Sequence, residues 1–151
     1  MTASILIIEH HDDHRVLIEA ALRDDAVTID SVETGEGALM RLGMSNFGCV
    51  VLGSPVPVTF GSESSTILDL FDLLAPNLAS RLVIVTSGRS VEIVRRALKM
   101  QVHAIFLAPF DAAELREVVR ICLRGETPPR RLYGTSAEIE RLITQEPADS
   151  L

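Results

Sequence analysis

Short runs of consecutive apolar residues alternate along the chain with longer segments in which apolar residues recur every three or four positions. Four of the runs are rich in Val, Ile and Leu, and they cover residues 4–8, 49–52, 82–85 and 104–107. Runs of this length that are apolar at successive positions are typical of parallel strands covered on both faces. A fifth run, residues 27–32, alternates imperfectly between apolar and polar residues and predicts an edge strand with one wetter face.

The segments between the runs have the apolar spacing of amphipathic helices. The predicted helices cover residues 14–23, 35–42, 66–74, 90–100 and 111–123. Asp12, Ser90 and Asp111 are the predicted N-caps, because their side-chain oxygens can accept an N–H group of the first helical turn. Parallel strands joined by helices need right-handed crossovers, so five strand–helix repeats predict a three-layer α/β/α domain over about residues 3–124.

The chain changes character after Arg124. Residues 125–131 contain Gly and two Pro and are typical of a linker, and residues 135–144 predict a short amphipathic helix capped by Thr135 or Ser136. Residues 145–151 are expected to fray, and the whole tail, residues 125–151, is too short for a second domain. The tail can pack on its own domain or dock on a partner. The longest predicted loop, residues 53–65, follows the third strand, at the sheet end where such folds place their sites.

Composition narrows the range of functions. The chain has 151 residues, and 21 acidic against 14 basic residues give a net charge of −7, which argues against a large nucleic-acid footprint. The apolar runs are too short to span a membrane, and the N-terminus lacks the basic region of a signal peptide. Cys49 and Cys122 lie in apolar stretches and are predicted to be buried free thiols in a reducing cytoplasm. Lys99 is the only lysine.

Four segments, in order and with matching spacing, resemble the receiver domain of bacterial response regulators. Residues 5–15 resemble the family's first strand and acidic cluster, and residues 31–39 its second strand, turn and second helix. Residues 82–87 resemble the fourth strand with its switch hydroxyl, and residues 105–111 the fifth strand, where the family usually has Lys-Pro-Phe. The resemblance implies a flavodoxin-like α/β fold with a five-stranded parallel sheet in the order 2-1-3-4-5. It also implies a role in two-component signal transduction.

The family's phosphorylation chemistry uses five groups at the strand ends. Two acids hold a magnesium ion, an aspartate after the third strand attacks a phosphoryl donor, a Thr or Ser binds the phosphoryl group, and a lysine neutralises its charge. Glu9 matches the first acid and Thr86 the hydroxyl. His10, Gly53 and Ala108 stand at the positions of the second acid, the acceptor aspartate and the lysine.

These three replacements imply a degenerate phosphorylation pocket. A neutral imidazole at His10 lacks the negative charge that Mg²⁺ favours, and glycine at position 53 has no side chain that could form an acyl phosphate. No acidic residue lies between Gly37 and Ser62 to replace the acceptor, and Lys99 falls in the fourth predicted helix. The resemblance therefore implies a pseudo-receiver with no catalytic residue, no cofactor and no enzymatic activity.

Two further features bear on signalling. Ile105 stands where the family usually has an aromatic switch residue, and its aliphatic side chain either alters the usual switch coupling or is simply a core residue. The family's usual partner and dimer face combines the fourth helix, fifth strand and fifth helix. Its basic positions here are Arg89, Arg95, Arg96, Lys99, Arg116 and Arg120. These charges can steer a protein partner or form an ordinary solvated surface.

Residues 9–14 form a dense run of possible metal ligands that includes His10, His11 and Asp13. Adjacent residues at a strand-to-helix junction point apart, and no remote Cys or His completes a tetrahedral set, so no metal site is predicted. Our main hypothesis is a phosphorylation-independent receiver-like module that acts through protein–protein contacts, with a possible homodimer. The alternative is a ligand or metal sensor that reuses the strand-end pocket, lined by His10, His11, Thr86 and residues 53–65.

Overall fold

The computed structural model of the chain describes residues 3–54, 68, 71, 77–87 and 91–149. The described elements follow in the order β1 (Ala3–Ile8), α1 (Asp12–Leu22), β2 (Val27–Val32), α2 (Gly35–Met44), β3 (Cys49–Ser54), a short 3-10 helix η1 (Ala79–Arg81), β4 (Leu82–Ser87), α4 (Val91–Met100), β5 (Ala104–Ala108), α5 (Ala112–Leu123), β6 (Leu132–Tyr133) and α6 (Ser136–Asp149). Most of the predicted helix over residues 66–74 and of the predicted loop over residues 53–65 lies outside the described residues.

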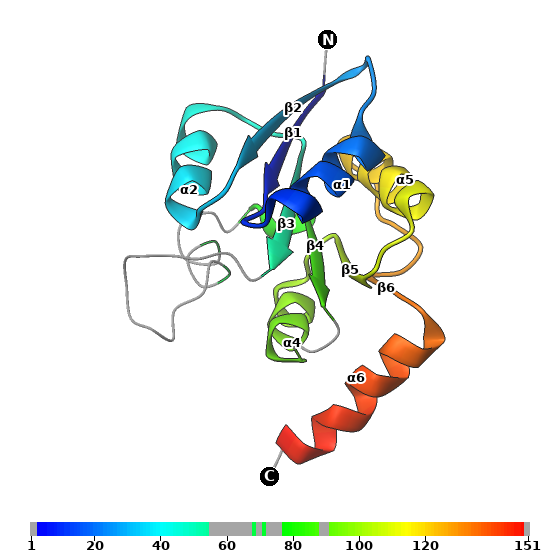
Figure 1. Cartoon of the computed structure of the whole chain (residues 1–151). Coiled ribbons are helices and arrows are strands. Elements are labelled where there is room, and N and C mark those ends of the chain that lie inside the picture. Colours follow the sequence, from blue (N-terminus) through cyan, green and yellow to red (C-terminus); the bar gives the residue numbers. More distant parts are fainter. Residues whose placement is uncertain (1–2, 55–67, 69–70, 72–76, 88–90, 150–151) are drawn as a thin grey trace.

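The strands form one parallel sheet in the order β2-β1-β3-β4-β5-β6. The predicted α/β fold and the order 2-1-3-4-5 are confirmed, and β6 adds a sixth strand. Helices α1 and α5 cover one face of the sheet, and α2 and α4 cover the other (Figure 1). Strand β2 is at an edge, as its mixed polar pattern predicted.

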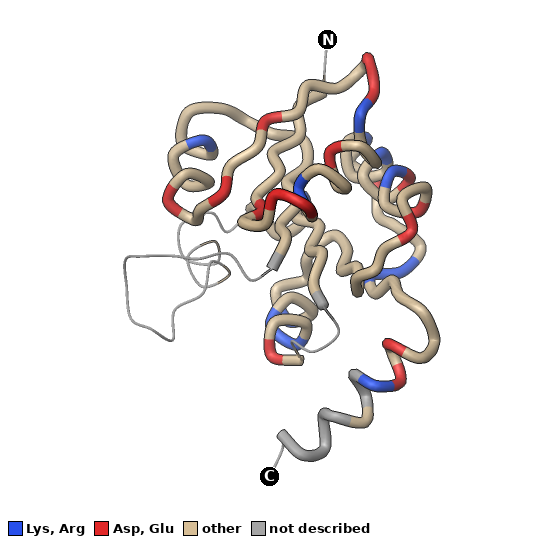
Figure 2. The backbone as a smooth tube through the Cα atoms, viewed as in Figure 1, with Lys and Arg blue, Asp and Glu red and all other residues tan. Residues whose placement is uncertain are grey.

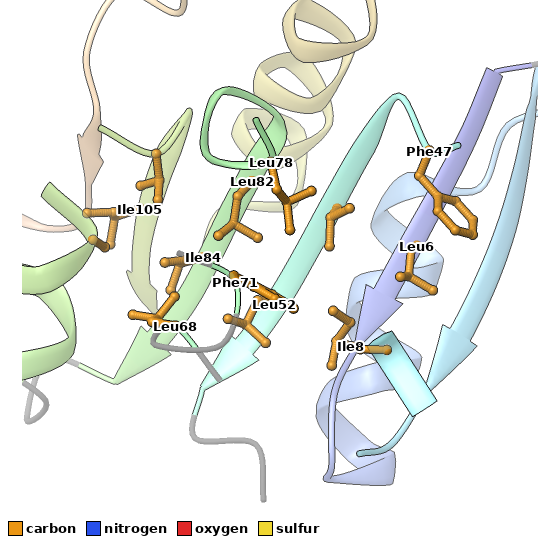
Figure 3. Packing of buried hydrophobic residues seen from close by; sticks show 14 of the residues in the cluster. Leu6, Ile8, Phe47, Leu52, Leu68, Phe71, Leu78, Leu82, Ile84 and Ile105 are labelled. Atoms are coloured by element: carbon orange, nitrogen blue, oxygen red, sulfur yellow. The ribbon is translucent and has the colours of Figure 1, made fainter. Parts of the chain in front are cut away.

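Alternate residues along each inner strand pack on opposite faces of the sheet. In β1, Ile5 and Ile7 join the cluster beneath α1 and α5, whereas Leu6 and Ile8 join the cluster beneath α2 and α4. Figure 3 shows part of the second cluster, including Leu6 and Ile8. Because both faces are covered, the central parts of these strands are apolar at successive positions, which is the pattern that identified them in the sequence.

The tail packs on its own domain through β6. Leu132 and Tyr133 pair in parallel with Ile105 and Phe106 of β5, and the Tyr133 ring stacks on the Phe106 ring with centroids 4.6 Å apart. Arg130 reinforces this contact, since its guanidinium lies 4.5 Å from the centre of the Tyr133 ring. A strand of two residues is too short to show an alternating pattern, so the sequence did not predict it.

Three predicted helix ends are tested by the structure. Asp111 caps α5 by accepting the N–H of Glu114 at 3.0 Å, as predicted. Asp12 is not a cap: α1 begins at this residue, and its N-cap is His11, which makes no capping hydrogen bond with its side chain. Helix α6 is capped by Thr135 and continues to Asp149, beyond the predicted end at residue 144.

Cys49 and Cys122 are buried free thiols, as the apolar stretches around them predicted. A hydrogen bond with Cys122 and burial both raise the pKa of the Cys49 thiol well above its usual value. Among the described helices, none combines the length and the apolar character that a membrane span needs.

Candidate functional site

Four of the predicted site residues meet at the carboxyl ends of the central strands. Glu9 follows β1, Gly53 lies near the end of β3, Thr86 near the end of β4, and Ala108 ends β5. Glu9, Thr86 and Ala108 line a cavity of about 690 Å³. The rest of its lining comes from His11, His14, Leu17, Ile18, Val85, Pro109, Phe110 and Ala112. The cavity therefore lies between the start of α1 and the ends of β4 and β5.

Glu9 fills the space that a side chain at position 53 would need. A Cβ atom built on Gly53 would lie 2.1 Å from Oε1 and 2.6 Å from Cδ of Glu9, far inside ordinary contact distance. The Glu9 side chain points this way because strand alternation places residue 9 on the same side as Ile5 and Ile7. The residue is 4% exposed, so its carboxylate is enclosed beside the Gly53 backbone.

The enclosed carboxylate contacts the first turn of α1. Its Oε2 accepts the backbone N–H of His11 at 3.1 Å, and the His11 Nδ1 lies 3.9 Å from the same oxygen. The His14 Nδ1 lies 3.7 Å from Oε1. The His11 and His14 rings are stacked, with centroids 5.2 Å apart and planes inclined by 23°. Both rings are more than half exposed, whereas the Glu9 side chain is not.

His10 takes no part in this group. It is exposed, its ring meets the His11 ring edge-on at 5.3 Å, and it is absent from the described residues that line the cavity. The structure therefore brings His14, rather than His10, together with His11 and Glu9. The sequence carried a signal for this set, because His11 and His14 are three residues apart on one helical turn and Glu9 precedes them by two residues.

The wall of the cavity near β5 is largely apolar. Ala108 leaves a methyl group at the position of the family's lysine, and the following Pro109 is joined to it by a cis peptide bond. Lys99 is on α4, which covers the opposite face of the sheet from the cavity. Thr86 is buried, with 2% of its surface exposed.

The structure places Ile105 in the core and the predicted basic residues on two separate helices. Ile105 is fully buried in the cluster beneath α4. The basic residues divide between the two faces of the sheet, because α4 and α5 cover opposite faces (Figure 2). On α5, Arg116 donates to the carbonyl of Ala21 at 2.8 Å and Arg120 donates to Asp24 at 3.2 Å. These two side chains join α5 to the end of α1. Arg89 lies outside the described residues.

A family model of the response regulator receiver domain matches residues 5–120. The fold is also similar to solved receiver domains at low sequence identity. The receiver domain of an HD domain-containing protein from Pseudomonas fluorescens Pf-5 is 17% identical, with a TM-score of 0.69 over 83% of this chain and 97% of that one. The NtrX receiver domain from Brucella abortus is 21% identical, with a TM-score of 0.66 over 80% of this chain and 98% of that one. No curated protein sequence matches the chain.

Proposed function

The chain belongs to the response regulator receiver domain family, and from this premise we propose that it signals through protein contacts without accepting a phosphoryl group. The observation that carries the proposal is the contact between Gly53 and Glu9. The acceptor position has no side chain, and the neighbouring carboxylate occupies the space where an acceptor side chain would extend.

The charge around this point also argues against phosphorylation. Without a bound cation, a phosphoryl group at the end of β3 would lie beside the enclosed carboxylate of Glu9, and two like charges in a site of low exposure repel each other. Ala108 offers no cation to offset that repulsion, and His10 is not among the described residues that line the cavity. We therefore propose that Glu9, His10, Gly53, Thr86 and Ala108 form a degenerate pocket, and that the domain has no catalytic role of its own.

We propose the exposed side of α4 as the partner surface. The tail covers the edge of β5 and its helix α6 contacts α4, while Arg116 and Arg120 bond within the chain, so the exposed residues of α4 are the part of the family's usual face that we propose for a partner. Leu98, which is 43% exposed, and the neighbouring Lys99 give this surface an apolar contact beside a positive charge. A homodimer through the whole face would require the tail to move.

We propose that the domain acts in the cytoplasm, where reducing conditions keep Cys49 and Cys122 as thiols.

The pocket is tested by adding beryllofluoride and Mg²⁺ to the isotopically labelled protein and recording backbone amide spectra. Mg²⁺ alone is the control for metal effects. We expect no shift at Glu9, Thr86 or their neighbours beyond that control, because no carboxylate at the end of β3 can hold the phosphoryl analogue. A shift centred on these residues would contradict the proposal.

The partner surface is tested by charge reversal. Full-length wild type, Lys99→Glu and the matched control Arg23→Glu, which changes an exposed residue at the end of α1, are used as bait in a pull-down. We expect a partner that binds wild type and Arg23→Glu but not Lys99→Glu. A partner that binds all three equally would show that α4 is not the surface involved.

A further inference from the structure

We propose that Glu9, His11 and His14 form a binding site for a divalent transition-metal ion, with Zn²⁺ as the probe. This inference goes beyond the proposed function and does not depend on it. It rests on a juxtaposition of ligand atoms that neither the acidic cluster nor the helix start would supply alone.

The three side chains present one ligand atom each, and these atoms lie within 4.8 Å of one another. Tetrahedral Zn²⁺ with bonds of about 2.0–2.2 Å places its ligand atoms about 3.4 Å apart. The Glu9 oxygens are already 3.9 Å and 3.7 Å from the Nδ1 atoms of His11 and His14. To reach coordination distance, the two imidazoles must move slightly closer to Glu9. Both rings are exposed and can change rotamer without disturbing the core.

Glu9 supplies the fixed part of the site. Its carboxylate is enclosed between the Gly53 backbone and the start of α1, and Oε2 is held by the backbone N–H of His11. Within the described part of the chain, its ion-pair partners are the imidazoles of His11 and His14, which carry a charge only when protonated. A bound dication would supply lasting positive charge next to an enclosed carboxylate.

The helix start is compatible with a cation despite the positive end of its dipole. Helix α1 has Asp12 and Asp13 in its first turn, and these acids offset the dipole close to the site. His11 is the N-cap residue but makes no capping hydrogen bond through its side chain, so its imidazole is not committed to the helix backbone.

The ligand types select the class of metal. Two imidazole nitrogens and one carboxylate oxygen suit Zn²⁺ and related transition metals, whereas Mg²⁺ prefers oxygen ligands and retains water. Three protein ligands leave a coordination position for water or a small anion, as in zinc sites with an open position. All three ligands line the 690 Å³ cavity, so that position is accessible from it.

The test uses untagged full-length protein stripped of metal with a chelator and then titrated with Zn²⁺ by calorimetry. We expect saturable binding that is weakened at least about tenfold by His11→Ala or His14→Ala. The matched control is His10→Ala, which removes an exposed imidazole beside the site but outside its ligand set. We expect this control to leave Zn²⁺ affinity unchanged, and excess Mg²⁺ not to compete.

Two outcomes would overturn the proposal. One is that the wild type fails to bind Zn²⁺. The other is that His10→Ala weakens Zn²⁺ binding as much as His14→Ala does, while Glu9→Gln has no effect. That result would mean that Zn²⁺ binds loosely to exposed imidazoles rather than at the proposed site. Circular dichroism spectra of each variant show whether it remains folded. Imidazole NMR signals give a second readout, in which Zn²⁺ shifts His11 and His14 and leaves the buried His103, at the start of β5, unmoved.

Discussion

Replacing Gly53 with Ala tests the contact between position 53 and Glu9 directly. The new Cβ would lie 2.1 Å from Oε1 of Glu9, and ordinary contact begins at 3.4 Å, so the oxygen must move by about 1.3 Å, the difference between these two distances. We expect a shift of this size to weaken or break the hydrogen bond from the His11 N–H to Oε2. A hydrogen bond to a charged group contributes about 1.5–3 kcal/mol.

An opposing effect comes from the backbone. The φ of Gly53 lies outside the left-handed region, and glycine in a strand interior costs about 0.5–1 kcal/mol relative to alanine. The two effects together predict that Gly53→Ala lowers the free energy of unfolding by about 0.5–2.5 kcal/mol. When Glu9 is also replaced by Ala, the clash is absent, and the same change at position 53 is expected to be neutral or stabilising.

The assay is urea unfolding of the wild type, the two single variants and the double variant, combined as a double-mutant cycle. We expect a coupling free energy of about 1.5–3 kcal/mol between positions 9 and 53. If Gly53→Ala has the same effect with and without Glu9, to within about 0.5 kcal/mol, the two residues do not compete for one space.

Three further predictions concern the rest of the fold. Burial lowers the pKa of His103, although its ring hydrogen-bonds to the carbonyl of Val118 at 3.1 Å. As the pH falls from neutral, the unfolded chain therefore binds a proton at His103 before the folded chain does, and this favours unfolding. The urea midpoint should fall more steeply with decreasing pH in wild type than in His103→Gln. The same pH dependence of the midpoint in both proteins would contradict this. Tyr133→Ala should cost about 3 kcal/mol of unfolding free energy, whereas Tyr133→Phe should cost almost nothing, because in the described structure the buried hydroxyl has no hydrogen-bond partner. If Tyr133→Phe lost as much unfolding free energy as Tyr133→Ala in urea, the stacking of the ring on Phe106 would not be the source of the stability. Cys49 should react with a thiol reagent only as fast as the protein opens, since burial keeps it protonated and inaccessible; rapid labelling of native protein would disagree.

The strands and most helices were predictable because burial leaves a direct trace in the sequence. Strands covered on both faces must be apolar at successive positions, and residues 49–52 and 82–85 show this without any knowledge of their neighbours. The short strand β6 leaves no such trace. Its position depends on the stacking of Tyr133 on Phe106, a contact between residues 27 positions apart in a chain segment that otherwise resembles a linker.

The candidate site was predictable as a location and only partly as a set of contacts. The positions of Glu9, Gly53 and Thr86 at strand ends followed from the order of the elements. The packing of the Glu9 carboxylate against Gly53 did not, because it depends on the direction of one side chain in three dimensions. The approach of His14 to Glu9 was missed for a similar reason: α1 begins at Asp12, two residues before the predicted start, which brings His14 onto its first turn.

We propose that this receiver-family domain does not accept a phosphoryl group. The most direct measurement is the intact mass of the full-length protein after incubation with acetyl phosphate and Mg²⁺, followed by peptide mapping of any modified species. We expect an unchanged mass, because Gly53 has no nucleophile and Glu9 is enclosed beside it. A gain of one phosphoryl group, mapped to Glu9 or to any other carboxylate at the strand ends, would contradict it.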